Sequence, residues 1–239
     1  MKLLIDQGNS RLKYCRWDGK RYHTPGISDL AHLMTSNSDL DDIDEVWISS
    51  VRDDKEQNSL KDSLSELNVP IRFARTQSRT AGLVNSYSEP AMMGVDRWLA
   101  MLAIWREVQG EFVLIDAGTA LTFDYVEFDG VHQGGHIIPG LELMRDALTS
   151  RTDRIKVTSS FTANRTLANN TADAVLHGCM TTLTAYLETM LTSLPESIRE
   201  VIFITGGDAV LLQESMHFDS HLRQDLVFQG LVEYFAVNT

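Results

Sequence analysis

The stretch Leu3-Leu4-Ile5-Asp6-Gln7-Gly8-Asn9-Ser10 decides the fold, because it has a counterpart in Val113-Leu114-Ile115-Asp116-Ala117-Gly118-Thr119-Ala120. Each copy is a short apolar run that ends in Asp-x-Gly. A strand-like stretch follows each copy, over residues 12–17 and 121–128, and ends at an Asp-Gly turn of the kind that starts a hairpin. The repeat predicts two similar β-hairpin units, one opening each half of the chain.

Strands and helices alternate through both halves. Apolar periodicity predicts strands over 45–51, 71–74 and 201–204, and helices over 58–67, 97–108, 141–148, 171–194 and 224–237. Gly230 lies inside the last helix, where glycine is unfavourable. The pattern indicates an α/β protein with two lobes facing a cleft. The junction at Gln109-Gly110-Glu111 predicts an N-terminal lobe over residues 1–110 and a C-terminal lobe over residues 111–239.

Composition limits the partners and the compartment. The 239 residues include 21 Lys plus Arg and 33 Asp plus Glu, a net charge of −12, which argues against duplex DNA or an anionic membrane as a main partner. With 43% hydrophobic residues, long-range disorder is excluded. The two cysteines exclude a disulfide scaffold, and no stretch is apolar for the roughly 18 residues that a membrane span needs. We expect a cytoplasmic protein without a nucleic-acid or membrane partner.

Asp-x-Gly directly after a buried strand suits phosphate binding. The glycine lets the backbone approach a bulky anion, and free amides and a nearby hydroxyl donate hydrogen bonds to phosphate oxygens. The carboxylate is then placed to hold a magnesium ion or its water. The alternative is an ordinary turn, where Asp and Gly are common. Two occurrences in matched hairpins favour phosphate binding, and Lys13 either adds positive charge to the first loop or is a surface lysine.

A third glycine turn, Thr205-Gly206-Gly207-Asp208-Ala209, follows the strand predicted over 201–204. It either lies against a nucleotide base or ribose, or is only a tight connection. The chain contains neither Gly-x-x-x-x-Gly-Lys-Ser/Thr nor Gly-x-Gly-x-x-Gly, which excludes a P-loop and the usual dinucleotide fingerprint.

The segment from Tyr87 to Trp98 contains an acidic residue and a positively charged residue side by side, Asp96 and Arg97. Asp96 stands at the start of the helix predicted over 97–108, where capping is a sufficient explanation for an acid. The functional alternative is a base that accepts a proton from a substrate hydroxyl, with Arg97 holding an anionic group such as a carboxylate. These groups together with three glycine turns suit phosphoryl transfer to a small acid.

Six motifs follow one another along nearly the whole chain. They are Asp6-x-Gly8-Asn9-Ser10-x-x-Lys13, Gly94-x-Asp96-Arg97, Asp116-x-Gly118-Thr119, Gly134-Gly135-x-Ile137-x-Pro139-Gly140, Asn170-Thr171-x-x-Ala174 and Gly206-Gly207-Asp208. In this order they resemble the type III pantothenate kinases, also described as Bvg accessory factor-like proteins. Ser10 stands where the family often has threonine and keeps the hydroxyl, and Gln7 occupies a variable position.

The resemblance implies a fold and an activity. The fold is the duplicated, ribonuclease H-like one of acetate and sugar kinases, Hsc70 and actin. The implied activity is ATP-dependent phosphorylation of pantothenate at its primary hydroxyl, which gives 4′-phosphopantothenate and opens coenzyme A biosynthesis. The implied cofactors are ATP, Mg²⁺ and a monovalent cation, K⁺ or NH₄⁺, and the implied assembly is a homodimer.

The resemblance also implies residue roles. The loop made of Asp6, Gln7, Gly8, Asn9, Ser10, Arg11, Leu12 and Lys13 would hold the ATP phosphates, and Thr119 would contact ATP. The pantothenate pocket would be lined by Tyr87, Gly94, Val95, Asp96 and Arg97, with Asp96 as the proton acceptor. Thr171 is similar to the family threonine that reaches pantothenate, and Asp116 resembles the aspartate that binds the monovalent cation.

Two other functions fit the same residues. One is a transcriptional accessory protein on the same fold, which the charge of −12 disfavours as a direct DNA binder. The other is a different small-molecule kinase or a phosphohydrolase in which Asp96 activates water. Fold alone does not separate these.

The helix predicted over 171–194 has an unusually wide apolar stripe. It runs through Val175, Cys179, Leu183 and Leu187 and is flanked by Leu176, Met180, Tyr186 and Met190. That width exceeds what one buried face of a surface helix needs. It indicates either full burial inside one lobe or burial against a symmetry mate, as the resemblance favours.

Overall fold

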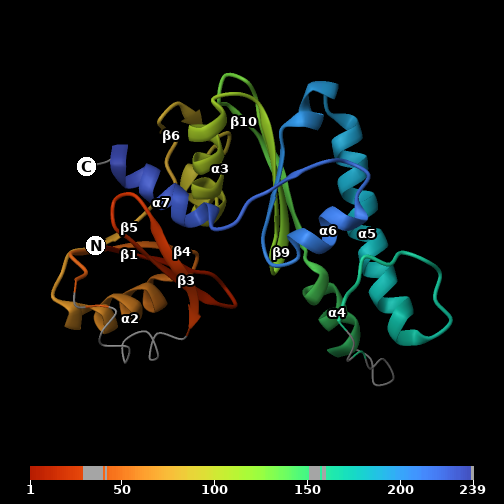
Figure 1. Cartoon of the computed structure of the whole chain (residues 1–239), viewed down its shortest axis with the longest axis horizontal. Coiled ribbons are helices and arrows are strands. Elements are labelled where there is room, and N and C mark those ends of the chain that lie inside the picture. Colours follow the sequence, from red (N-terminus) through yellow and green to blue (C-terminus); the bar gives the residue numbers. More distant parts are fainter. Residues whose placement is uncertain (29–39, 41, 151–156, 158–159, 238–239) are drawn as a thin grey trace. The chain divides into compact units, whose positions relative to one another are not determined.

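The computed structural model of the chain describes residues 1–28, 40, 42–150, 157 and 160–237. The chain forms two compact units, Met1–Gln109 with Asp225–Thr239, and Gly110–Gln224. Each unit is built on a five-stranded sheet, and Figure 1 labels some of the strands of each.

The first unit contains the sheet β3-β2-β1-β4-β5, in which β1 pairs antiparallel with β2 and parallel with β4. Its elements are β1 (Lys2–Gln7), β2 (Leu12–Trp17), β3 (Tyr22–Ser28), β4 (Glu45–Ser50), α2 (Asp54–Leu64), η2 (Ser65–Leu67), β5 (Ile71–Phe73), β6 (Arg79–Thr80), β7 (Leu83–Val84), η3 (Pro90–Met92), α3 (Val95–Val108) and α7 (Leu226–Val237).

The second unit repeats this connectivity in the sheet β10-β9-β8-β11-β12, where β8 pairs antiparallel with β9 and parallel with β11. Its elements are β8 (Phe112–Ala117), β9 (Ala120–Val126), β10 (His132–Pro139), α4 (Leu141–Ser150), α5 (Thr171–Ser193), η4 (Glu196–Glu200), β11 (Ile202–Thr205), α6 (Ala209–Ser215) and β12 (His221–Leu222). The matching strand orders confirm the internal repeat seen in the sequence.

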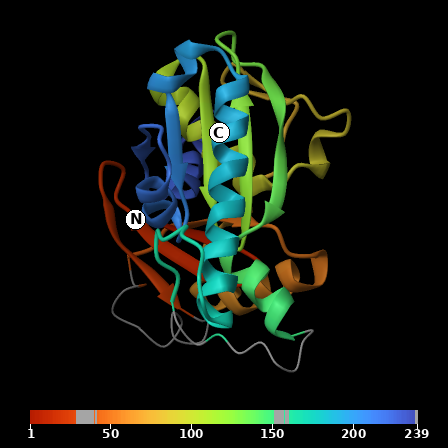
Figure 2. The ribbon, with the colours of Figure 1, turned by 90° about the vertical axis from the view of Figure 1, so that its right-hand side faces the viewer.

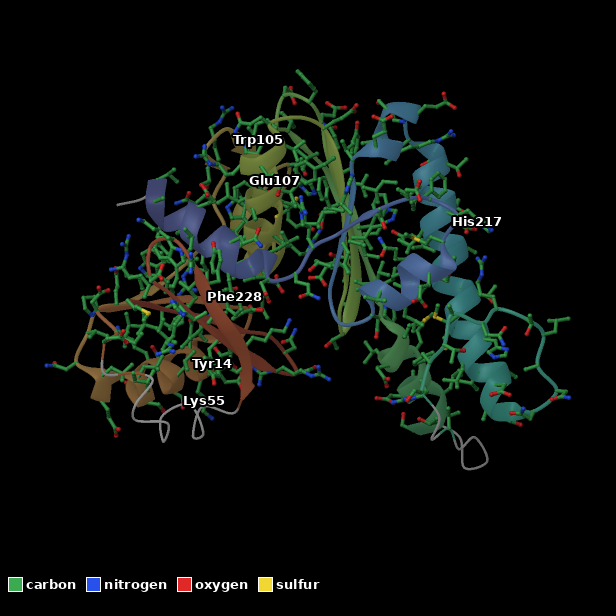
Figure 3. All side chains as sticks on the ribbon, in the orientation of Figure 1. Tyr14, Lys55, Trp105, Glu107, His217 and Phe228 are labelled. Carbon is green, nitrogen blue, oxygen red and sulfur yellow. The ribbon has the colours of Figure 1, made fainter. Side chains whose placement is uncertain are left out.

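The first sheet is covered on both faces, which explains why its central strand is a continuous apolar run. Ile5 and Ile48 pack with Leu60 and Leu64 of α2 on one face. Tyr14, labelled in Figure 3, also lies on this side, between the sheet and α2. Helix α7 lies on the opposite side of the sheet (Figure 1).

Helix α7 belongs to the first unit, so the sequence-based assignment of residues 111–239 to one C-terminal lobe is corrected for this helix. The ring centroids of Phe235 on α7 and Trp47 on β4 are 4.9 Å apart. Gly230 explains how α7 packs on α3, because a Cβ at this position would collide with the backbone of Leu99. The glycine weakens the helix as an isolated segment and permits its close packing.

The apolar stripe of α5 is buried inside the second unit. Val175, Cys179, Leu183 and Leu187 join the core formed by the sheet and α6, and each is less than a tenth exposed. Figure 2 shows α5 running along the strands of this unit. Burial within one chain therefore accounts for the wide stripe. Neither α5 nor any other helix in the described ranges is long and apolar enough to span a bilayer.

Candidate active site

The first motif forms a tight turn at one edge of the first sheet. The backbone N–H of Gly8 donates to the carbonyl of Arg11 at 3.0 Å, which closes the connection from β1 to β2. Asn9, Ser10 and Arg11 are exposed at the tip of the turn. Leu12 begins β2 and pairs with Gln7. The turn therefore presents a hydroxyl, an amide and a guanidinium side chain to solvent beside a strand end.

Asp6 faces two polar neighbours on the adjacent strands. It is the register partner of Lys13 on β2 and of Ser49 on β4, and register partners project from the same face of a sheet. Ser49 is fully buried, and its hydroxyl has no hydrogen-bond partner among the described residues. A carboxylate next to an orphaned hydroxyl gives oxygen donors, the type that Mg²⁺ prefers.

The sequence did not single out Arg52, which also reaches this turn. Its Nη1 donates to the carbonyl of Asn9 at 3.0 Å, while its Nη2 pairs with Glu56 on α2. Arg52 follows β4, and the ends of the parallel strands β1 and β4 meet at one sheet edge. Sequence reasoning missed Arg52 because strand pairing brings it to the turn, and the spacing of residues along the chain does not reveal that pairing.

The Gly-x-Asp-Arg motif lies at the start of α3. Gly94 is the N-cap residue and Val95 begins the helix, so the idea that Asp96 itself caps α3 is corrected. Asp96 occupies the first turn, where its Oδ1 accepts from the backbone N–H of Arg97 at 2.8 Å. A Cβ on Gly94 would lie 2.5 Å from that same oxygen. Glycine is required here because a side chain would displace the carboxylate.

The start of α3 adjoins the edge that carries the tight turn. A Cβ built on Gly94 would lie 3.9 Å from Cγ1 of Val51, the residue directly after β4. The backbone N–H of Val51 donates to the carbonyl of Gln7 at 3.2 Å. The first unit thus brings together two segments that are far apart in the sequence, Asp6–Lys13 and Gly94–Arg97.

Arg97 is a buried cation with an aromatic partner. Its side chain is 6% exposed, its Nη1 donates to the Tyr87 hydroxyl at 3.0 Å, and its guanidinium carbon lies 5.9 Å from the ring centroid of Tyr87. A guanidinium has five donors in a planar fork that matches a carboxylate or phosphate. This pair can therefore hold a small anionic group beside Asp96.

Three motifs converge at one end of the second sheet. The N–H of Gly118 donates to the carbonyl of Ala120 at 3.2 Å, and the carbonyl of the exposed Thr119 accepts from Gly140 at 3.0 Å. Asp116 on β8 is the register partner of Thr205 on β11. The glycine turn after β11 folds back onto β8 as well, where Asp208 donates its N–H to the carbonyl of Ala117 at 3.0 Å.

Thr171 is the first residue of α5. It is exposed, and the preceding Asn170 caps the helix by accepting from the N–H of Asp173 at 3.0 Å. Thr171 lines a groove of about 980 Å³ formed mainly by α4, α5 and the segment before α5. Pro139, at the end of β10, also lines this groove.

Comparison with solved structures identifies the fold class. The chain superimposes on a Baf family protein from Campylobacter jejuni with a TM-score of 0.64 at 18% identity, covering 99% of this chain and 98% of that one. It superimposes equally well, at 11% identity and 97% coverage of both chains, on a Sinorhizobium meliloti protein assigned as a 2-dehydro-3-deoxygalactonokinase. A polyphosphate/ATP-glucomannokinase from Arthrobacter sp. strain KM superimposes over 100% of this chain and 100% of its own, with a TM-score of 0.50 at 14% identity. The fold is that of the sugar kinases and actin-like ATPases.

Sequence comparison narrows the class to one family. The family model for type III pantothenate kinase matches residues 2–193. The type III pantothenate kinase of Acinetobacter baumannii (strain ACICU) is 34% identical over 98% of this chain and 97% of its own length. That of Cellvibrio japonicus (strain Ueda107) is 36% identical over the same shares. The chain belongs to the type III pantothenate kinase family, as the six motifs indicated.

Proposed function

We propose that this protein transfers the γ-phosphate of ATP to the primary hydroxyl of pantothenate, giving 4′-phosphopantothenate for coenzyme A biosynthesis. One observation carries the proposal beyond family membership. The Gly8–Arg11 turn, which suits phosphate, and the Gly94–Arg97 segment, which carries a carboxylate and a buried cation, meet at one sheet edge of the first unit. Phosphoryl transfer needs mainly alignment and charge neutralisation, which this juxtaposition supplies.

The turn and its flanking residues are assigned to ATP. Backbone N–H groups at the exposed tip of the Gly8–Arg11 turn and the side chains of Ser10, Arg11 and Lys13 would donate to phosphate oxygens. Asp6, next to the orphaned hydroxyl of Ser49, fits Mg²⁺ or its bound water. When bound, Mg²⁺ neutralises phosphate charge. Thr119, exposed beside Gly118 in the second unit, is assigned to nucleotide binding on the family resemblance alone.

The start of α3 is assigned to pantothenate. Arg97 and Tyr87 would hold the carboxylate of the substrate, and Gly94 and Val95 would line the pocket beside them. Asp96 would accept the proton of the substrate hydroxyl as that oxygen attacks the γ-phosphorus. The new bond is then between this oxygen and phosphorus, the bond to the β–γ bridging oxygen breaks, and ADP leaves with that electron pair.

Asp116 is assigned to the monovalent cation. It lies half-buried at the end of β8, close to the carbonyl-rich turns at Thr119 and Gly206. A carboxylate together with carbonyl oxygens is the donor set that suits K⁺. The assignment rests on the family resemblance and is supported by this placement.

We also propose a homodimer in which Thr171 contributes to pantothenate binding. The α5 stripe is buried within one chain, whereas apolar side chains are exposed along α4 and the segment before α5. Leu143 and Leu148 are 46% and 43% exposed, Leu167 is fully exposed, and Leu143 and Leu148 line the groove that contains Thr171. A second copy would cover this apolar surface. Light scattering at assay concentration should give twice 26.8 kDa, and a mass near 26.8 kDa with full activity contradicts the dimer.

The cysteines fit a reducing compartment such as the cytoplasm. Cys15 and Cys179 are both buried free thiols. Burial raises the pKa of Cys15 to about 11 and raises that of Cys179 as well, which disfavours the reactive thiolate form of each.

An ATP-coupled assay against a panel of small hydroxy acids tests the proposed function. With Mg²⁺ and K⁺ present, the enzyme should form ADP when pantothenate is the acid supplied and not with the other acids of the panel. ATP hydrolysis that ignores every acid would instead support a phosphohydrolase, and turnover of another acid alone would identify a different kinase.

A further inference from the structure

Asn85 is a buried polar residue that none of the six motifs contains. It lies directly after β7 and is 8% exposed. Its backbone N–H donates to the carbonyl of Ser78 at 2.9 Å, which ties it to the segment before β6. Burial of an amide side chain is unfavourable unless its polar atoms are bonded, so the contacts of this side chain indicate its role.

The side chain of Asn85 joins three segments of the first unit. Its Oδ1 accepts from the backbone N–H of Tyr87 at 2.9 Å, an Asx turn that sets the direction of the chain as it reaches Tyr87. Its Nδ2 donates to the carbonyl of Gln77 at 3.4 Å and to Sδ of Met93 at 3.7 Å. One amide therefore contacts both Tyr87 and Met93, the residue directly before Gly94, and so links the two ends of the segment that we assign to pantothenate.

Met93 is also held by a hydrogen bond from a residue other than Asn85. Oγ1 of Thr76 donates to the carbonyl of Met93 at 2.9 Å, directly before Gly94. Gln77 is held in turn, because its Oε1 accepts from Thr80 at 2.6 Å and its Nε2 donates to the Tyr234 hydroxyl of α7 at 3.3 Å. Gln77 and Met93, two of the residues that Asn85 bonds, are therefore themselves held in place by hydrogen bonds, one of which joins Gln77 to α7.

We propose that Asn85 is a positioning residue for pantothenate, an inference that rests on the proposed function. The backbone of Tyr87 depends on the Asx turn, and the Tyr87 hydroxyl accepts from Arg97 at 3.0 Å. Loss of the Asn85 side chain would release Tyr87 and with it one partner of Arg97. Among the described residues, the side chain of Asn85 bonds to Gln77, Tyr87 and Met93 and not to Asp96 or the Gly8–Arg11 turn, so its effect should fall on pantothenate rather than on ATP.

The test is a comparison of Michaelis constants. Asn85→Ala should raise KM for pantothenate by about tenfold or more, with KM for ATP and kcat changed by less than roughly threefold, because misplaced binding groups weaken ground-state binding. Asn85→Asp keeps the acceptor for the Tyr87 N–H and should restore most of the affinity. The matched control is Asp129→Ala, which removes an exposed Asx turn to the N–H of Val131 in the second unit and should leave all three constants unchanged.

Several results would overturn the inference. An unchanged KM for pantothenate in folded Asn85→Ala, or an equal rise for both substrates, shows that Asn85 only supports the fold. Should Asn85→Ala fail to melt cooperatively, Asn85→Ser replaces it, and the same selectivity for pantothenate is required. Tyr87→Phe and Arg97→Lys test the proposed pantothenate site independently of Asn85. If these two variants raise KM for pantothenate and Asn85→Ala does not, the proposed site is supported and the positioning role of Asn85 is wrong.

Discussion

The Tyr87 hydroxyl accepts a hydrogen bond from Nη1 of Arg97 at 3.0 Å, and the same guanidinium lies 5.9 Å from the tyrosine ring. The two side chains come from different segments, a loop after β7 and the first turn of α3. Arg97 is almost fully buried, and the planar fork of its guanidinium matches the carboxylate of the pantothenate that we propose binds beside it.

Arg97→Lys should therefore raise KM for pantothenate by roughly tenfold to a hundredfold, because an ammonium loses the planar fork that binds a carboxylate through two bonds. Tyr87→Phe keeps the ring and should have a smaller effect. Steady-state kinetics with pantothenate as the varied substrate measure both. A pantothenate KM that stays at the wild-type value in Arg97→Lys would remove Arg97 from the pocket.

Asp96→Asn should lower kcat by at least about a hundredfold if Asp96 is the proton acceptor. The N-cap of α3 is Gly94, so the substitution should change the melting temperature little. Turnover per folded molecule and thermal unfolding should be measured on the same preparation. A large loss of stability with turnover intact would assign Asp96 to the helix and not to the reaction.

Activity should be high in K⁺ or NH₄⁺ and low in Na⁺, and Asp116→Ala should abolish that difference. The expected effect is on the dependence of rate on cation concentration at saturating ATP and pantothenate. Equal rates of the wild-type enzyme in Na⁺ and K⁺ would show that Asp116 serves another purpose, such as holding the turn at Thr119.

Stability should depend on the ionisation of Asp18, which starts the hairpin between β2 and β3. Hydrogen bonds from the backbone N–H groups of Arg21 and Lys20 lower the pKa of this carboxyl to about 2, and His23 lies 3.1 Å from its Oδ2. A carboxyl whose pKa is lowered on folding stabilises the protein above the unfolded pKa of about 4, and this contribution is lost as the pH falls toward 2.

Unfolding of wild type and Asp18→Asn should be compared between pH 7 and pH 2. We expect the wild type to be more stable at neutral pH and the difference to shrink between about pH 4 and pH 2. The other carboxylates are common to both proteins and cancel in the comparison. A difference that stays constant over this range would contradict a role for the charge of Asp18.

The sequence predicted the repeated hairpins and most helices because local apolar periodicity determines them. It failed where a contact joins distant segments. The place of α7 depends on Gly230 meeting Leu99, and the burial of the α5 stripe depends on a sheet whose strands are far away in the chain. The motif residues of the site carry recognisable spacing. Arg52 and Asn85 do not, because strand pairing and buried hydrogen bonds bring them to it.

The fate of the γ-phosphate shows whether the protein phosphorylates pantothenate. The purified protein should be incubated with pantothenate, Mg²⁺, K⁺ and ATP carrying an isotope label in the γ-phosphate, and the product examined by mass spectrometry and phosphorus NMR. We expect a stoichiometric pair of products, ADP and pantothenate that carries the label on its primary hydroxyl. Folded protein that leaves pantothenate unlabelled, or that releases the label only as inorganic phosphate, would contradict the proposed function.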